Sequence, residues 1–205
     1  MSRRQMLLSE FTATPDGYET TIDEDVAVLM QTLLGETIVI LDAPTQEPLL
    51  SALLSEDERD EPDDPTLKIL LPSMSSDPEE ASSLRALTED ALRTLKTERL
   101  QVIGHKLAEL ATSESRTFTI EREDVWQWLS GLNDLRLVLA GRLEVNKLDD
   151  TEYWYERVAA LLTRDTAQPR QISAEDLVGL VFVLVSWWQD SLLQAVQEGD
   201  TASNL

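Results

Sequence analysis

Three short polar groups interrupt stretches of this sequence that are otherwise rich in leucine, valine and tryptophan. The groups are Asn133, Asp134 and Arg136; Trp187, Gln189 and Asp190; and Glu89 with Arg93. If the helices that carry them are buried, each charged side chain needs a partner, because an unpaired buried charge costs several kcal/mol or changes its protonation state. We therefore expect Asp134 and Arg136 to pair across helices, with Asp190 and Arg93 as the candidate partners.

Two interpretations of this polar set remain open. In the first, the set is a structural clamp that fixes the register of three helices. In the second, it forms part of a pocket for a small ligand or a substrate, lined by Asn133, Arg136, Trp187 and Gln189. The clamp is the favoured interpretation, because a pocket requires a concave surface and the order of residues does not provide one.

The other residue types that commonly carry chemistry are scarce. The chain has no cysteine, which excludes disulfides, thiolate catalysis and thiol redox sensing. Its single histidine, His105, has no second histidine with which to form a metal site or a catalytic dyad. The seven glycines are scattered, so there is no glycine-rich loop to hold a phosphate. We expect a protein that is not an enzyme and that binds no metal and no cofactor.

The charge of the chain is strongly negative, with 39 acidic and 17 basic residues and a net charge of -22. Such a field repels nucleic-acid phosphates, so DNA binding by this chain unaided is disfavoured. The longest apolar run, Leu177 to Trp188, is shorter than the roughly 20 residues that span a bilayer. The first residues lack the apolar stretch of a signal peptide. We therefore expect a cytoplasmic protein without a membrane segment.

Hydrophobic patterning predicts a mainly α fold, an irregular bundle of five to six helices with a small N-terminal β-hairpin. Residues 1–22 contain the hairpin, turning at Pro15-Asp16-Gly17. The whole chain, 1–205, is predicted to be a single helical domain, with a flexible acidic loop at 43–64 and a frayed tail at 198–205. Residues 36–41 fit a helix or a strand equally well, and Phe118 to Ile120 fit a short extended segment.

Capping residues mark most of the expected helix starts. Asp64, Asp77 and Ser173 each precede a helical pattern, and Ser173 with Asp176 resembles a capping box. Gly35 is expected to end the first helix. The helices are predicted at 23–35, 65–72, 77–111, 122–143, 151–163 and 173–197.

Four segments, in this order and spacing, resemble an actinobacterial family long catalogued as a domain of unknown function and later named after the oxidative stress regulator AosR. They are Asp64–Pro72, Leu84–Arg93, Trp126–Leu139 and Trp187–Leu193. The resemblance implies a protein that takes part in stress-linked gene control through protein partners, such as a sigma factor or another part of the transcription machinery, or the Clp protease machinery. Because the chain lacks cysteine, a thiol switch is not carried over.

We therefore expect a regulatory or adaptor protein that acts through protein–protein contacts. The alternatives are a transcriptional regulator that binds DNA directly, or a small-ligand-binding protein or enzyme that uses the Asn133–Arg136 region. A homodimer is compatible with each of these functions.

Overall fold

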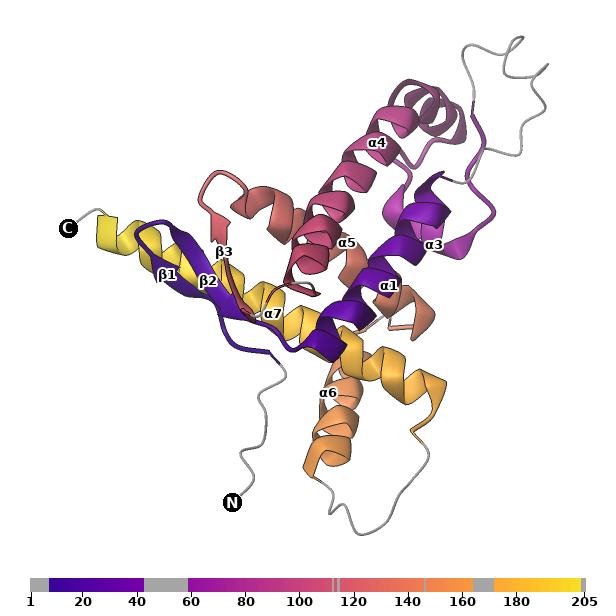
Figure 1. The fold of residues 1–205 in the computed structure, drawn as a ribbon. Helices are drawn as coiled ribbons and strands as arrows, with labels where there is room; N and C mark the ends of the chain where they lie inside the picture. Colours follow the sequence, from indigo (N-terminus) through magenta and orange to yellow (C-terminus); the bar gives the residue numbers. More distant parts are fainter. Residues whose placement is uncertain are drawn as a thin grey trace.

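The computed structural model describes residues 8–42, 59–111, 113, 115–145, 147–163 and 172–203. In this part of the chain, six helices accompany a three-stranded antiparallel sheet (Figure 1). The strands are β1 (Thr12–Thr14), β2 (Gly17–Thr21) and β3 (Thr117–Glu121). The helices are α1 (Glu24–Asp42), α3 (Pro65–Leu70), α4 (Pro78–Ala111), α5 (Val125–Arg142), α6 (Leu148–Thr163) and α7 (Ala174–Ser203). The predicted mainly α fold with an N-terminal hairpin is confirmed.

The hairpin turns where the sequence indicates, and it gains a third strand. β1 pairs antiparallel with β2, and β2 pairs antiparallel with β3. Gly17, at the start of β2, has a φ of 150°, and a Cβ at this position would lie 2.0 Å from the carbonyl oxygen of Ile120. Only glycine therefore fits where the hairpin meets β3. The extended segment predicted at Phe118 to Ile120 is this third strand.

Local capping chemistry sets the starts of three helices. Asp64 Oδ1 accepts two backbone N–H groups of the first turn of α3, at 2.7 and 3.2 Å. Asp77 Oδ1 does the same for α4, at 3.1 and 3.0 Å. At α7, Ser173 Oγ accepts the N–H of Asp176 at 3.0 Å, and the Asp176 carboxylate accepts the N–H of Ser173 at 3.2 Å. This reciprocal pair is the predicted capping box.

Helix ends differ from the prediction. Gly35 does not end α1, which continues to Asp42 and makes residues 36–41 helical. The apolar face continues past the glycine, since Thr37 and Leu41 are fully buried, and this packing outweighs the roughly 1 kcal/mol cost of a glycine within a helix. At the other end of the chain, α7 extends to Ser203 instead of ending near residue 197.

The starts of α5 and α6 also differ from the prediction, at Val125 instead of 122 and at Leu148 instead of 151. Most of the predicted acidic loop, residues 43–58, lies outside the described residues, as do residues 204–205 of the predicted tail.

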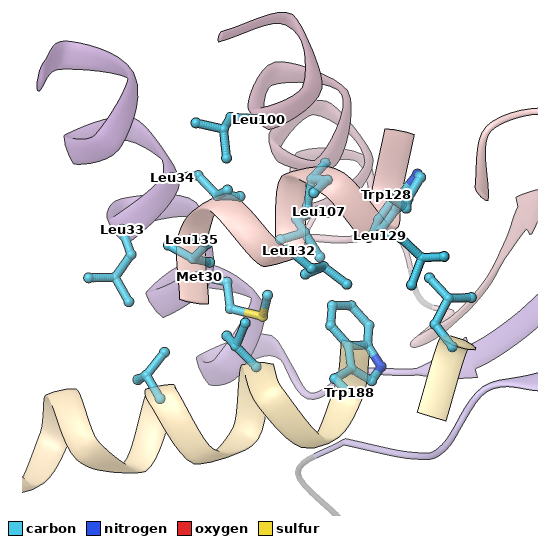
Figure 2. Packing of buried hydrophobic residues seen from close by; sticks show 14 of the residues in the cluster. Met30, Leu33, Leu34, Leu100, Leu107, Trp128, Leu129, Leu132, Leu135 and Trp188 are labelled. Atoms are coloured by element: carbon cyan, nitrogen blue, oxygen red, sulfur yellow. The ribbon is translucent and has the colours of Figure 1, made fainter. Parts of the chain in front are cut away.

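The core forms around α5, which packs between α4 and α7 (Figure 2). Its buried side chains include Trp128, Leu132 and Leu135, and the Trp128 ring meets Trp188 of α7, with ring centroids 6.2 Å apart. The sheet lies along the C-terminal half of α7, and α6 lies against its N-terminal half (Figure 1). Over Ala174–Gly199, α7 is long and apolar enough to cross a membrane, and 50% of its most apolar window is buried in the structure.

Candidate functional site

Glu89, one of the predicted polar residues, lies at the centre of an arginine cluster on α4. Its side chain is 2% exposed. Arg93 Nε and Nη2 each lie 2.8 Å from Glu89 Oε1, and Arg85 Nη1 lies 3.4 Å from Oε2. Arg59 Nε approaches Oε1 at 3.8 Å. Residues four apart share one side of a helix, so Arg85 and Arg93 flank Glu89 from both neighbouring turns. We call these four residues the Glu89 cluster.

The arginines of the Glu89 cluster also bind the ends of two other helices. Arg93 Nη1 donates to the carbonyl oxygen of Leu41 at 2.6 Å, where α1 ends. Arg85 Nη1 donates to the carbonyl oxygen of Leu71 at 3.1 Å, at the C-cap of α3. Carbonyls at a helix C-terminus lack intrahelical partners and carry partial negative charge, which a guanidinium satisfies. This arrangement joins α1 and α3 to α4, which is the geometry of a structural clamp.

Asp134 has a different partner from the one expected. Its Oδ1 lies 2.5 Å from Lys96 Nζ, with the Asp134 side chain 4% exposed. The predicted pairing of Asp134 with Arg93 is wrong, because Arg93 is already bound to Glu89 and the turn of α4 that meets α5 carries Lys96. Arg136, for which Asp190 was the candidate partner, binds Asn133 instead. The second oxygen of Asp134 has no hydrogen-bond partner among the described residues.

The remaining predicted residues lie where α5, α6 and α7 meet. Arg136 Nη2 donates to Asn133 Oδ1 at 2.9 Å within α5. Gln189 Nε2 donates to the carbonyl oxygen of Leu129 at 3.2 Å and so links α7 to α5. Trp187 is half-buried and packs against the core. The predicted polar set is therefore divided between the Glu89 cluster, the Lys96–Asp134 pair and this junction.

Asp190 is exposed, and its charge acts on Tyr155 of α6. Burial raises the pKa of Tyr155, the Asp190 carboxylate raises it further, and Ser186 and Arg136 oppose the rise. The charges of Asp190 and Arg136 are therefore close enough to influence one hydroxyl on α6. Sequence reasoning did not anticipate the part that α6 plays at this junction.

A shallow hollow lies beside the Glu89 cluster. It lies between Leu71, Met74 and Leu92, and its cavity volume is about 10 Å³. This volume is below the roughly 300–1,000 Å³ of ordinary small-molecule sites. In the part of the chain that the structure describes, no three His, Asp or Glu side chains come together as metal ligands.

A line of exposed apolar residues runs along one side of α6. Leu148 is 73% exposed, Tyr155 38% and Leu162 51%. They are spaced seven residues apart, with exposed Ala159 between the last two, so all four share one side of the helix. We call Leu148, Tyr155, Ala159 and Leu162 the α6 stripe. The seven-residue spacing is visible in the sequence, but the sequence does not show that this side of the helix is exposed.

Acidic residues border the α6 stripe on its solvent side. Asp149, Glu152 and Glu156 are all exposed. At 3.6 residues per turn they lie next to the stripe and away from the buried side of α6. Within the described residues, none of these three carboxylates forms an ion pair. We call them the acidic border.

The side of α6 next to the stripe is packed against α7. The ring of Trp154 lies over Gly179, where a Cβ would come within 2.3 Å of two ring atoms. Arg157 Nε contacts Asp176 Oδ1 at 2.6 Å, and the guanidinium lies 5.2 Å from the centre of the Trp154 ring. A side chain at position 179 would displace the tryptophan, so glycine is required for this close approach. The α6 stripe is thus presented on an anchored helix.

The anchoring contact predicts a pH dependence. Hydrogen bonds from Arg157, and then from Ser173, lower the pKa of Asp176 from 3.8 to about 2. Because the folded-state pKa lies below the ordinary value, the contact stabilises α6 on α7 fully above pH 3.8, and this contribution is lost as the pH falls through about 2. We expect an NMR titration of the Asp176 carboxyl to have its midpoint near the lower value. In Arg157→Leu the midpoint should move upward, and a wild-type midpoint near 3.8 would contradict the contact.

The chain was compared with protein families, curated proteins and solved structures. The model of one protein family, described as Domain of unknown function (DUF2017), matches residues 8–196. No curated protein matches, and no solved structure matches. The matched residues include the Glu89 cluster and the α6 stripe.

Proposed function

The chain belongs to the family described as a domain of unknown function (DUF2017), and within that family we propose that it is a non-enzymatic regulatory or adaptor protein that acts through protein–protein contacts. The observation that carries this proposal is the α6 stripe, with three large apolar side chains exposed in a line. The proposal includes a cytoplasmic location. It also includes a role like that of the actinobacterial AosR-like stress regulators, based on the four segments that resemble that family. Because the chain has no cysteine, this role does not include a thiol switch.

Grouped apolar exposure supports a contact surface. Single exposed leucines are ordinary on soluble proteins, whereas contiguous apolar patches rimmed by polar residues are typical of interaction sites. The members of the α6 stripe share one side of a single helix, and the acidic border gives them a charged rim. Figure 1 shows α6 projecting from the N-terminal half of α7, apart from α3 and α4. A partner could therefore approach the stripe without a rearrangement of the core.

Two observations disfavour the alternative functions. The basic side chains of the Glu89 cluster are bound to a carboxylate and to helix-end carbonyls, so they are not arranged to receive DNA phosphates. In the Asn133–Arg136 region, the two side chains bind each other, and Gln189 binds a main-chain carbonyl. The first bond lies within α5 and the second links α7 to α5, which supports a structural role for these side chains.

The test is a pair of substitutions in the α6 stripe, Leu148→Gln with Leu162→Gln. Both side chains are exposed, so the melting temperature should hardly change. The wild-type chain should recover partner proteins from the native host. The amount recovered with this variant should be lower by roughly tenfold or more, because apolar anchors carry most of the binding energy of an interface. The recovered proteins are quantified by mass spectrometry against the wild-type sample.

A matched control replaces two exposed leucines on α4, Leu87→Gln with Leu95→Gln. This control variant should recover the same proteins as the wild type. The regulatory part is tested in a host strain that lacks the chain. Stress-dependent transcripts should be restored by the wild type and by the control, and not by the stripe variant. Unchanged recovery with the stripe variant, or recovery of DNA alone, would refute the proposal.

A further inference from the structure

We propose that the α6 stripe binds a basic amphipathic helix of a partner protein, aligned along α6. This inference rests on the proposed function and adds the chemistry of the partner. It is carried by three features of α6: the spacing of its apolar residues, the charge of its border, and the packing of its buried side against α7.

The spacing of the stripe fits another helix. Leu148, Tyr155 and Leu162 follow a seven-residue interval, which is the repeat that lets two helices pack side by side. From Leu148 to Leu162 the helix rises about 21 Å, at 1.5 Å per residue. A helix of about 15 residues in the partner, apolar at every third or fourth position, covers that length.

The acidic border sets the charge of the partner. Asp149, Glu152 and Glu156 lie beside the stripe, and the single basic residue of α6, Arg157, is turned toward α7 and bound to Asp176. No cation of α6 itself therefore neutralises the border. Lysine or arginine residues on the polar flank of a docking helix would do so, and complementary charge of this kind gives an interface its specificity and speeds association.

Charge also decides against a second copy of this chain as the occupant. Two copies meeting antiparallel through the α6 stripe would bring their acidic borders to the same side of the interface, and in either orientation each copy carries a net charge of -22. Like charges facing each other across an interface cost free energy and slow encounter. The same repulsion applies to DNA. A basic helix is the occupant for which both the apolar line and the charged border are favourable.

The inference is tested with designed peptides and the full chain. The probe is a synthetic amphipathic helix with leucines in heptad spacing and lysines at the other positions. One comparison peptide has glutamate in place of lysine, and another has the leucines and lysines in scrambled order. We expect the ordered leucine–lysine peptide to bind most tightly, by fluorescence anisotropy, with an affinity that falls as salt is added.

Substitutions locate the binding. The stripe variant, Leu148→Gln with Leu162→Gln, should raise the dissociation constant roughly tenfold. Removing two border charges, Glu152→Gln with Glu156→Gln, should weaken binding and reduce its salt dependence. The matched charge control, Glu98→Gln with Glu123→Gln, removes two exposed carboxylates outside α6 and should bind as the wild type does.

Several results would overturn the inference. Equal binding of the scrambled peptide, or equal affinity of the border variant and its control, would mean a general attraction of cations to an acidic protein. A dimer seen by light scattering and lost in the stripe variant would make a second copy the occupant. If host proteins depend on the stripe but the leucine–lysine peptide does not displace them, the inference fails and the proposed function stands. If neither experiment depends on the stripe, both fail.

Discussion

Replacing Trp188 with alanine should lower the free energy of unfolding by about 3–5 kcal/mol, the range for deleting a buried aromatic side chain. Trp188 is fully buried and stacks on Phe11 with ring centroids 5.0 Å apart. It also meets the edges of Phe118 and Trp128, each at 6.2 Å. Its indole N–H donates to Thr20 Oγ1 at 3.2 Å, so the substitution also removes a buried hydrogen bond. One side chain thus joins the sheet, α5 and α7.

The measurement is urea denaturation followed by circular dichroism, since the substitution removes a fluorophore. The control is Trp126→Ala, which deletes the same ring from the exposed side of α5. That variant should change stability by no more than about 0.5 kcal/mol. A loss below about 1 kcal/mol for Trp188→Ala would show that the sheet and α7 are held together by something other than this aromatic contact.

The neighbouring residue shows why the sequence could not identify this contact. Trp187 was placed in the predicted polar set and Trp188 was not, although both belong to the same apolar run. Adjacent residues point about 100° apart on a helix, so one of the pair must face the core more directly. Which of them does so depends on how α7 is rotated about its own axis against α5. Tertiary packing sets this rotation.

Helix starts were predictable because their chemistry is local. Asp64, Asp77 and Ser173 cap the helices that directly follow them. Helix ends were less predictable, because they depend on distant packing. Gly35 predicts the end of the first helix, yet the burial of Thr37 and Leu41 keeps α1 helical beyond it. Where the apolar face of a helix continues, tertiary packing outweighs a local signal for the helix to end.

The partners of the polar residues were also predictable only where the two residues are close in sequence. Glu89 and Arg93 lie one turn apart on α4, so their proximity was visible in the sequence. Arg85 lies one turn before Glu89 and could have been found by the same rule. By contrast, the contact of Arg59 with Glu89 and that of Lys96 with Asp134 depend on how separate segments meet. Nothing in the residue order indicates which turn of α4 faces α5.

The Glu89 cluster makes the second large prediction. Replacing Glu89 with alanine should lower the free energy of unfolding by about 3–5 kcal/mol, because it leaves buried guanidinium groups without their carboxylate. Arg85 is buried, and the Arg93 side chain is 12% exposed. Without the Glu89 carboxylate the two guanidinium groups would repel each other. This repulsion would weaken the hydrogen bonds of Arg93 and Arg85 to the ends of α1 and α3. The loss is measured by urea denaturation, as for Trp188.

Asp90→Ala is the matched control, because it removes the next carboxylate along α4. Asp90 is exposed, and among the described residues its carboxylate pairs only with Arg59, at 2.8 Å, so its removal should cost less than about 1 kcal/mol. Comparing these two variants also distinguishes a structural clamp from a binding site at the Glu89 cluster. A clamp predicts that Glu89→Ala, kept at a temperature where it is folded, still binds partners through the α6 stripe, because the cluster joins α1, α3 and α4 and leaves α6 on α7. If Glu89→Ala kept wild-type stability but lost those partners, the cluster would be a binding site, since only direct contact with the partner would then connect it to the interaction.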